Sequence, residues 1–304
     1  MKVDTEKGRH GGLPLQVWQE RPMNGSESRV RVGLALGGGV ARGLAHVGVI
    51  SVLEEAGIPI DCVAGTSMGA IIGASYCAGL DVAALKAIAG RTGWWSVSRP
   101  LFSAGGLFTF SQMERWLEDN IGEFDVRDLA IPFACVASDL VTGERVVLWR
   151  GRLCRAIRAS CSVPGFVPPV EMDGRLLVDG GITDNIPADV ARMLGADYVI
   201  GVDVFMPALR RALGPFGKGI AAIETLVRHA GQGNAECDCL IVPHMEGLSY
   251  FRFADYRKFI ALGEEAARRR LPAIREGLAQ AEASRAERPL LAEPVEFDHM
   301  LVEN

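Results

Sequence analysis

Residues 61–80 read DCVAGTSMGAIIGASYCAGL, and the segment Gly65-Thr66-Ser67-Met68-Gly69 at their centre decides the fold. The residues before this segment are typical of a short β-strand, and residues 68–80, rich in Ala, Ile and Gly, are typical of a buried helix. A Gly-x-Ser-x-Gly pattern between a strand and a helix is typical of a nucleophile elbow, a tight turn that lifts the serine hydroxyl off the sheet. A glycine-rich turn with an incidental serine would give the same letters, so the rest of the chain has to distinguish the two interpretations.

A second glycine-rich segment, residues 37–43 (GGGVARG), follows a predicted strand at residues 30–36 and precedes a predicted helix at residues 44–56. It fails the dinucleotide fingerprint because the sixth position from Gly37 is Arg42, and it lacks the Gly-Lys-Ser/Thr of a Walker loop. Successive glycine N–H groups at the start of a helix can instead converge on a developing oxyanion. Because the two strands would lie side by side, we expect this loop and Ser67 to share one rim of the sheet.

The alternation of predicted strands and helices indicates an α/β fold with a mostly parallel central sheet and helices on both faces. Asp173-Gly174 predicts a hairpin turn between short strands. The remaining predicted strands are residues 131–137, 145–149, 198–204 and 239–243, and the remaining predicted helices are residues 152–160, 187–194, 221–229 and 255–270. We expect a flexible arm at residues 1–28, one domain at residues 29–270, and a helix end with a loose acidic tail at residues 271–304.

Composition narrows the class of protein. The 304 residues carry a formal charge of −5, with no basic stripe of the kind that binds nucleic acid. The N-terminus lacks the apolar core of a signal peptide, and no apolar run is long enough for a transmembrane helix. The seven cysteines, an odd number mostly in apolar segments, favour buried thiols in a reducing, cytoplasmic compartment. Cys237 and Cys239 with His244 miss the zinc spacings, so we expect no metal and no cofactor.

A serine nucleophile needs a group that accepts its proton, and two candidates follow from the sequence. The order Ser67, Asp179, His244 matches the chain order of an α/β-hydrolase triad. Alternatively, Asp179 acts alone, because the two glycines after it leave its carboxylate uncrowded. The ordinary role of an Asp before Gly is to cap a turn. His46, within the helix after the glycine segment, is expected to be structural.

Together these motifs resemble the patatin-like phospholipase family over about residues 30–265, most closely its bacterial branch, which is similar to the catalytic domain of neuropathy target esterase. The resemblance rests on motifs in the family's order, namely Gly37–Gly43, Gly65–Gly69, Ser160-Cys161-Ser162-Val163-Pro164, Asp179-Gly180-Gly181, and the following Asn185 and Pro187.

The resemblance implies a three-layer patatin-like architecture and a serine hydrolase that cleaves lipid acyl esters through an acyl-enzyme intermediate. It implies a Ser-Asp dyad without histidine, with Ser67 as nucleophile and Asp179 as base. It also implies an oxyanion hole formed by the amides of Gly37, Gly38 and Gly39, with Arg42 supporting the loop. Val40 stands where many relatives have glycine, so we expect it to influence acyl-chain preference or rate. An exposed Asp is too weak a base at neutral pH, and we therefore expect burial to raise the pKa of Asp179.

A lipid substrate has to leave a bilayer or micelle, and an aromatic stretch suggests where. Trp94, Trp95, Phe102 and Phe108 are candidates for an interfacial lip that contacts the inner face of a membrane peripherally. Packing into the core is the alternative for these rings. Two other functions stay open, a general esterase or thioesterase acting on small acyl groups and a non-catalytic lipid-binding protein of the same fold.

Overall fold

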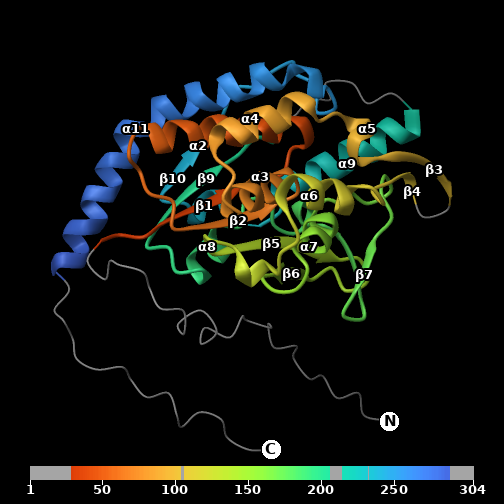
Figure 1. Cartoon of the computed structure of the whole chain (residues 1–304), viewed down its shortest axis with the longest axis horizontal. Coiled ribbons are helices and arrows are strands. Elements are labelled where there is room, and N and C mark those ends of the chain that lie inside the picture. The colour runs from red at the N-terminus through yellow and green to blue at the C-terminus, as the bar shows by residue number, and fades with distance from the viewer. Residues whose placement is uncertain (1–28, 104–105, 206–213, 232, 288–304) are drawn as a thin grey trace, which may run out of the picture.

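The computed structural model describes residues 29–103, 106–205, 214–231 and 233–287 (Figure 1). The predicted flexible arm at residues 1–28 and the tail beyond residue 287 lie outside the described residues. Two sheets are present in the described part of the chain, a central sheet of eight strands and a two-stranded hairpin.

The central sheet has the strand order β10-β9-β1-β2-β5-β8-β7, and β6 also pairs with β5. The pairs from β10 to β5 are parallel, whereas β5 pairs antiparallel with both β6 and β8, and β7 pairs antiparallel with β8. This arrangement confirms the predicted mostly parallel α/β sheet. The strands are β1 (Val32–Leu36), β2 (Cys62–Thr66), β5 (Phe133–Asp139), β6 (Arg145–Leu148), β7 (Val170–Met172), β8 (Arg175–Asp179), β9 (Tyr198–Val202) and β10 (Cys239–Ile241).

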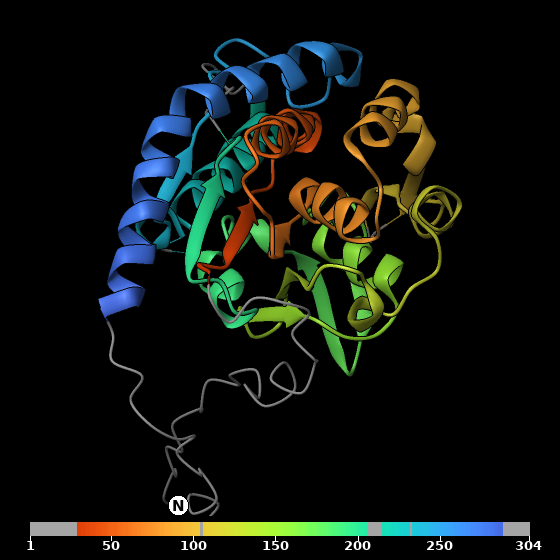
Figure 2. The same cartoon turned by 60° about the vertical axis from the view of Figure 1, so that its left-hand side comes forward.

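Helices cover both faces of this sheet, with most of them on one side (Figure 1). That side carries α2 (Ala45–Glu55), α3 (Met68–Cys77), α4 (Val82–Arg91), α7 (Leu153–Ser160) and α11 (Tyr256–Glu287). Figure 2 shows α11 lying along α2, which it contacts. On the other face α8 (Ala188–Met193) packs on small strand residues such as Ala35, Ala64 and Ala134, which leave room for a closely packed helix.

The remaining elements are short or lie at the edges. They are the 3-10 helices η1 (Val40–Leu44), η2 (Val126–Asp128), η3 (Gly180–Ile182) and η4 (Phe253–Asp255), the helices α5 (Trp94–Val97), α6 (Met113–Ile121), α9 (Gly214–His229) and α10 (Gly233–Glu236), and the hairpin strands β3 (Arg99–Ser103) and β4 (Gly106–Thr109). The predicted turn at Asp173-Gly174 is confirmed, since both residues have positive φ, 51° and 73°, as a two-residue hairpin of this type requires.

Strand register brings the sequence motifs to one level of the sheet. Leu36 on β1 is opposite Gly65 on β2, and Thr66 is opposite Val136 on β5. On the same side of β5 as β2, and just past the end of β2, Ala137 is opposite Asp179, the last residue of β8. The ends of β1, β2 and β8 therefore lie at the same rim, although β8 runs antiparallel to its neighbour.

Two predicted features differ from the structure. The C-terminal helix does not end at residue 270 but continues as α11 to Glu287, with Pro272 inside it. Its length follows from packing, because Ile274 is fully buried and Leu278 and Ala281 also pack on the core. All seven cysteines are free thiols, and six of them are buried as predicted, whereas Cys237 is half-buried.

Candidate active site

Ser67 occupies a strained turn between β2 and α3. Its φ of 54° and ψ of −120° lie in a region that a residue with a side chain rarely adopts. Two contacts hold it there, since its amide donates to Ser160 Oγ at 2.9 Å, and Gly69 lets α3 begin against β1, where a Cβ would lie 2.1 Å from the Leu36 carbonyl oxygen. This geometry has the features of the predicted nucleophile elbow, with the hydroxyl at the N-terminus of a helix.

Asp179 lies beside Ser67 and is held by three backbone or hydroxyl contacts. Its Oδ1 accepts the Gly181 amide at 2.8 Å, its amide donates to the Ser162 carbonyl at 2.9 Å, and its carbonyl accepts Ser138 Oγ at 3.0 Å. Burial raises the pKa of Asp179 to about 6, against the opposing effect of hydrogen bonds from Ser67 and Gly181. Ser67 and Asp179, distant in sequence, thus lie together in the wall of one cavity, close enough for the serine hydroxyl to lower the pKa of the carboxyl against the effect of burial.

The glycine loop differs from the expectation that Gly37, Gly38 and Gly39 all point their amides at one spot. The Gly37 amide extends the sheet by donating to the Val202 carbonyl at 3.1 Å, so it is not available to a ligand. The Gly38 amide donates to Asn185 Oδ1 at 3.0 Å. Within the described residues, the amides of Gly39 and Val40 have no protein acceptor, and both residues line the cavity next to Ser67.

Val40 adopts a φ of 49°. Glycine would adopt this φ without strain, whereas a β-branched residue adopts it only with strain. The backbone at Val40 is therefore strained at the position where many relatives are expected to have glycine.

Arg42 joins the glycine loop to the segment after β10. Its side chain is fully buried, donates to the carbonyls of Met245 and Leu248, and stacks on the Tyr250 ring with the guanidinium 3.9 Å from the ring centroid. The Ala41 amide adds a hydrogen bond to the Tyr250 carbonyl at 2.9 Å. Contacts of this kind are expected of a residue that supports the glycine loop, the role predicted for Arg42.

Neither His46 nor His244 has a hydrogen bond to Ser67 in the described part of the chain. His46 is fully buried, and its Nε2 bonds the Gly37 carbonyl at 2.8 Å. Burial lowers the pKa of His46 to about 4, so the ring is neutral and supports the loop, as expected for a structural residue. His244 is exposed and lies outside the set of cavity-lining residues. The triad alternative therefore finds no support in the described part of the chain.

A largely apolar cavity of about 460 Å³ opens above Ser67 and Asp179. Its volume falls within the range of small-molecule sites. Apolar and aromatic side chains form most of its wall, among them Ile71, Leu85, Ile88, Trp94, Phe110, Met113, Trp116, Phe166, Val227 and Phe253.

The side chains of the predicted aromatic lip differ in how far they are exposed to solvent. Trp94 is half-buried and packs edge-on against Phe108, with ring centroids 5.4 Å apart, and against Phe251 at 6.0 Å. Trp95 is 59% exposed, and Phe251, which sequence analysis did not single out, is 51% exposed. The side chain of Phe102 lies outside the described residues. No helix in the described part of the chain combines the length and apolarity needed to cross a membrane.

Several residues of the site were not assigned a role from sequence. Ser160 and Asn185 belong to segments that carry the family resemblance, so the signal was present, but their partners became clear only from the fold. Tyr250 lies in a loop without any motif, and nothing in the sequence indicated that it stacks on Arg42.

Comparison with protein families and known proteins gives consistent matches. A family model described as patatin-like phospholipase matches residues 34–192, more than half of the chain. An uncharacterized NTE family protein of Mycobacterium bovis is 43% identical over 180 residues, covering 58% of this chain and 50% of that protein. A lysophospholipase of Aspergillus fumigatus is 40% identical over 179 residues, covering 57% of this chain and 12% of that protein.

Neuropathy target esterase sws of Drosophila melanogaster is 36% identical over 184 residues, covering 57% of this chain and 13% of that protein. These matches therefore span half or less of each relative's own length. Among solved structures, VipD from Legionella pneumophila aligns with a TM-score of 0.48 at 13% identity, covering 88% of this chain and 73% of that one.

Proposed function

The chain belongs to the patatin-like phospholipase family, and from that premise we propose that it is a serine acyl hydrolase acting on the carboxylic esters of phospholipids or lysophospholipids. The observation that carries the proposal is that Ser67, in its strained turn, and the buried Asp179 lie together in the wall of one apolar cavity. An apolar wall suits an acyl chain, whereas a site for small polar acyl groups would need more polar groups.

In the proposed mechanism Ser67 Oγ attacks the ester carbonyl carbon while its proton passes to Asp179. The tetrahedral intermediate then collapses to an acyl-enzyme, and the alcohol leaves with that proton. Water attacks the acyl-enzyme next, giving a proton to Asp179; the second tetrahedral intermediate then releases the fatty acid as Ser67 Oγ takes that proton back, which restores both residues. A pKa of about 6 suits both roles of Asp179, because the carboxylate is mostly ionised at pH 7 yet accepts a proton more readily than an exposed Asp.

We assign the oxyanion hole to the amides of Gly39 and Val40. These are the loop donors without a protein acceptor, and each donor of this kind is typically worth about 3 kcal/mol of transition-state stabilisation. The Gly38 amide would take part only if it exchanged Asn185 for the oxyanion. Gly37 is excluded as an oxyanion donor, because its amide already donates to the Val202 carbonyl in the sheet.

Fatty-acid release from a micellar lysophospholipid tests the function, with a monomeric short-chain ester as the second substrate. We expect efficient turnover of the micellar lipid and a loss of at least about a thousandfold in Ser67→Ala. Preference for the monomeric ester would favour the general esterase. No release by either protein would favour the non-catalytic lipid-binding protein, and equal release by wild type and Ser67→Ala would refute Ser67 as the nucleophile.

We also propose that the exposed apolar side chains near the cavity contact the lipid surface. Trp95 and Phe251 are exposed; Phe251 lines the cavity, and Trp95 follows Trp94, which also lines it. Replacing Trp95 and Phe251 by Ala should weaken liposome flotation. Val141→Ala, which removes an exposed apolar side chain in the turn after β5, is the matched control. Unchanged flotation of the double variant would refute the contact. The cytoplasmic location stays a prediction from the sequence.

A further inference from the structure

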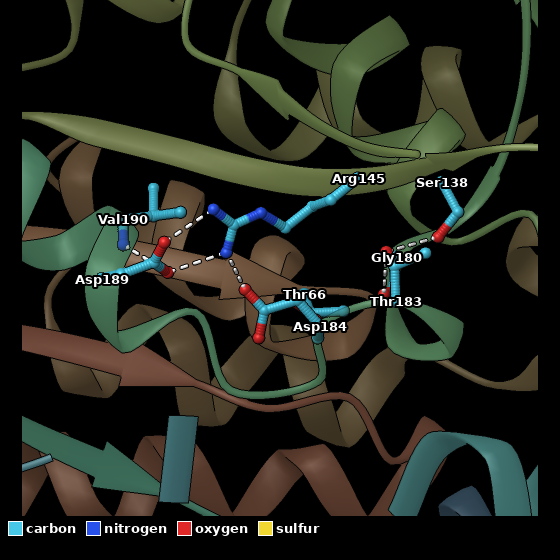
Figure 3. A network of polar contacts seen from close by, with 8 residues as sticks. All are labelled: Thr66, Ser138, Arg145, Gly180, Thr183, Asp184, Asp189 and Val190. Atoms are coloured by element: carbon cyan, nitrogen blue, oxygen red, sulfur yellow. Dashed lines mark hydrogen bonds and ion pairs between the residues drawn. The ribbon is translucent and has the colours of Figure 1, made fainter. Parts of the chain in front are cut away.

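An ion-pair network that the proposed mechanism does not use joins Arg145 to Asp184 and Asp189 (Figure 3). Arg145, the first residue of β6, forms a bidentate pair with Asp189, at 2.8 Å through Nη1 and 2.6 Å through Nη2. Its Nη1 also donates to Asp184 Oδ2 at 2.6 Å. One guanidinium therefore joins β6 to the first turn of α8 and to the loop that follows Asp179.

The inner half of this network is buried and specific. Asp184 is 3% exposed, and burial raises its pKa while the hydrogen bond from Arg145 opposes that rise. Removing the cation from a buried ion pair strongly destabilises the folded protein, because the carboxylate is left buried without a partner. The planar fork of Arg145 matches two carboxylates at once, which a lysine ammonium does not reproduce. The pair with Arg145 therefore fixes the position of the Asp184 side chain.

Asp184 and Asn185 connect this anchor to the parts of the site that do chemistry. The Asp184 carbonyl accepts Thr66 Oγ1 at 3.0 Å, and Thr66 immediately precedes Ser67. The Asp184 amide donates to the Gly180 carbonyl at 2.9 Å, next to Asp179. Asn185 Oδ1 accepts the Gly38 amide at 3.0 Å, which holds the glycine loop against the elbow. Two consecutive residues thus touch the nucleophile, base and oxyanion segments.

We propose that Arg145 is a positioning residue for acyl transfer: by fixing Asp184, it keeps the Asn185 carboxamide on the Gly38 amide and the glycine loop in register with Ser67. The inference rests on the proposed function, but it concerns a residue that touches no reacting atom. The cavity wall is built largely from other elements, so Arg145 is expected to affect kcat and to leave KM nearly unchanged. A loop displaced by about 1 Å costs about 100-fold in rate.

The kinetic test compares Arg145→Ala and Arg145→Lys with Arg175→Ala. Arg175 on β8 is a matched control, because it also pairs with one buried carboxylate, Asp139, and one exposed carboxylate, Glu144, without reaching the elbow or the glycine loop. We expect kcat to fall about 10- to 100-fold in Arg145→Ala with KM within about twofold of wild type. Arg145→Lys should lose less, since an ammonium keeps the charge near Asp184, and Arg175→Ala should keep wild-type kcat.

An independent readout is amide hydrogen exchange of the peptide that covers residues 36–44, measured by mass spectrometry. Arg145→Ala should release about one additional fast-exchanging amide there, that of Gly38, and Asn185→Ala, which removes the acceptor directly, should do the same. Arg175→Ala should leave the peptide unchanged. If Arg145→Ala does not fold, Arg145→Lys carries the comparison at both readouts.

The proposal is overturned if the Arg145 variants keep wild-type kcat, if they lose activity only through KM, or if the residue 36–44 peptide exchanges as in wild type. Failure of the proposed function would look different: wild type would hydrolyse no ester, while the exchange comparison would still decide whether Arg145 holds the glycine loop.

Discussion

Replacing Asp179 by Asn should stabilise the protein while strongly reducing its activity. The carboxylate is buried at the base of the cavity, and burial raises its pKa from 3.8 to about 6. The folded chain therefore binds this proton more tightly than the unfolded chain, so folding is opposed whenever the carboxylate has to be ionised. An Asn side chain has nearly the same shape. It can accept the Gly181 amide and donate to Ser67 Oγ, but it carries no charge to desolvate.

The size of the effect follows from the two pKa values. A difference of about 2 units at 1.36 kcal/mol per unit corresponds to about 3 kcal/mol of stability lost to the ionised group at pH 7. The sign is set by the raised pKa: the loss is absent below pH 3.8, grows as pH rises, and is complete above about pH 6. Asp179→Asn should therefore gain about 3 kcal/mol at pH 7 and roughly half as much at pH 5.

Urea unfolding followed by tryptophan fluorescence at several pH values between 5 and 8 measures this gain. Asp139→Asn on β5 is the control, because backbone hydrogen bonds lower the pKa of Asp139 and its replacement should reduce stability at pH 7. The same Asp179→Asn protein should lose about 10²- to 10⁴-fold in kcat. A variant at position 179 that is less stable than wild type at pH 7, or a stability difference that does not change with pH, would refute the reasoning.

Three further predictions concern the same site. The kcat/KM of wild type for an uncharged ester should fall about tenfold from pH 7 to pH 5, because Asp179 takes up a proton over this range. A kcat/KM that does not change with pH would contradict the assignment of Asp179 as the base. Val40→Gly should relieve a positive φ and raise the free energy of unfolding by about 1 kcal/mol, measured by urea unfolding; a loss would show that Val40 packing outweighs the strain. His244→Ala should keep kcat/KM within about twofold of wild type, whereas a loss of about a thousandfold would restore the triad.

The sequence predicted the features that depend on local pattern. The strand–turn–helix context located the turn at Ser67, and the GGGVARG segment marked the loop after β1. Both predictions succeed because a sharp turn between parallel strand and helix requires small residues at fixed spacing. The hairpin at Asp173-Gly174 was predicted for the same reason.

The features that were missed depend on partners distant in sequence. The hydrogen bond from Gly37 to Val202 required knowing that β9 lies beside β1, and no local pattern carries this information. The extension of α11 beyond Pro272 depends on packing that overrides the tendency of proline to end a helix. No sequence pattern indicated a role for Arg145, because its two carboxylate partners are distant from it in sequence.

Covalent labelling with a fluorophosphonate, read as the intact mass and then by peptide mapping, tests most directly whether Asp179 activates Ser67. The account predicts one adduct per chain, on the peptide that contains Ser67, and a labelling rate that falls about 10²- to 10⁴-fold in Asp179→Asn. An adduct on another residue, or Asp179→Asn labelled at the wild-type rate, would contradict it.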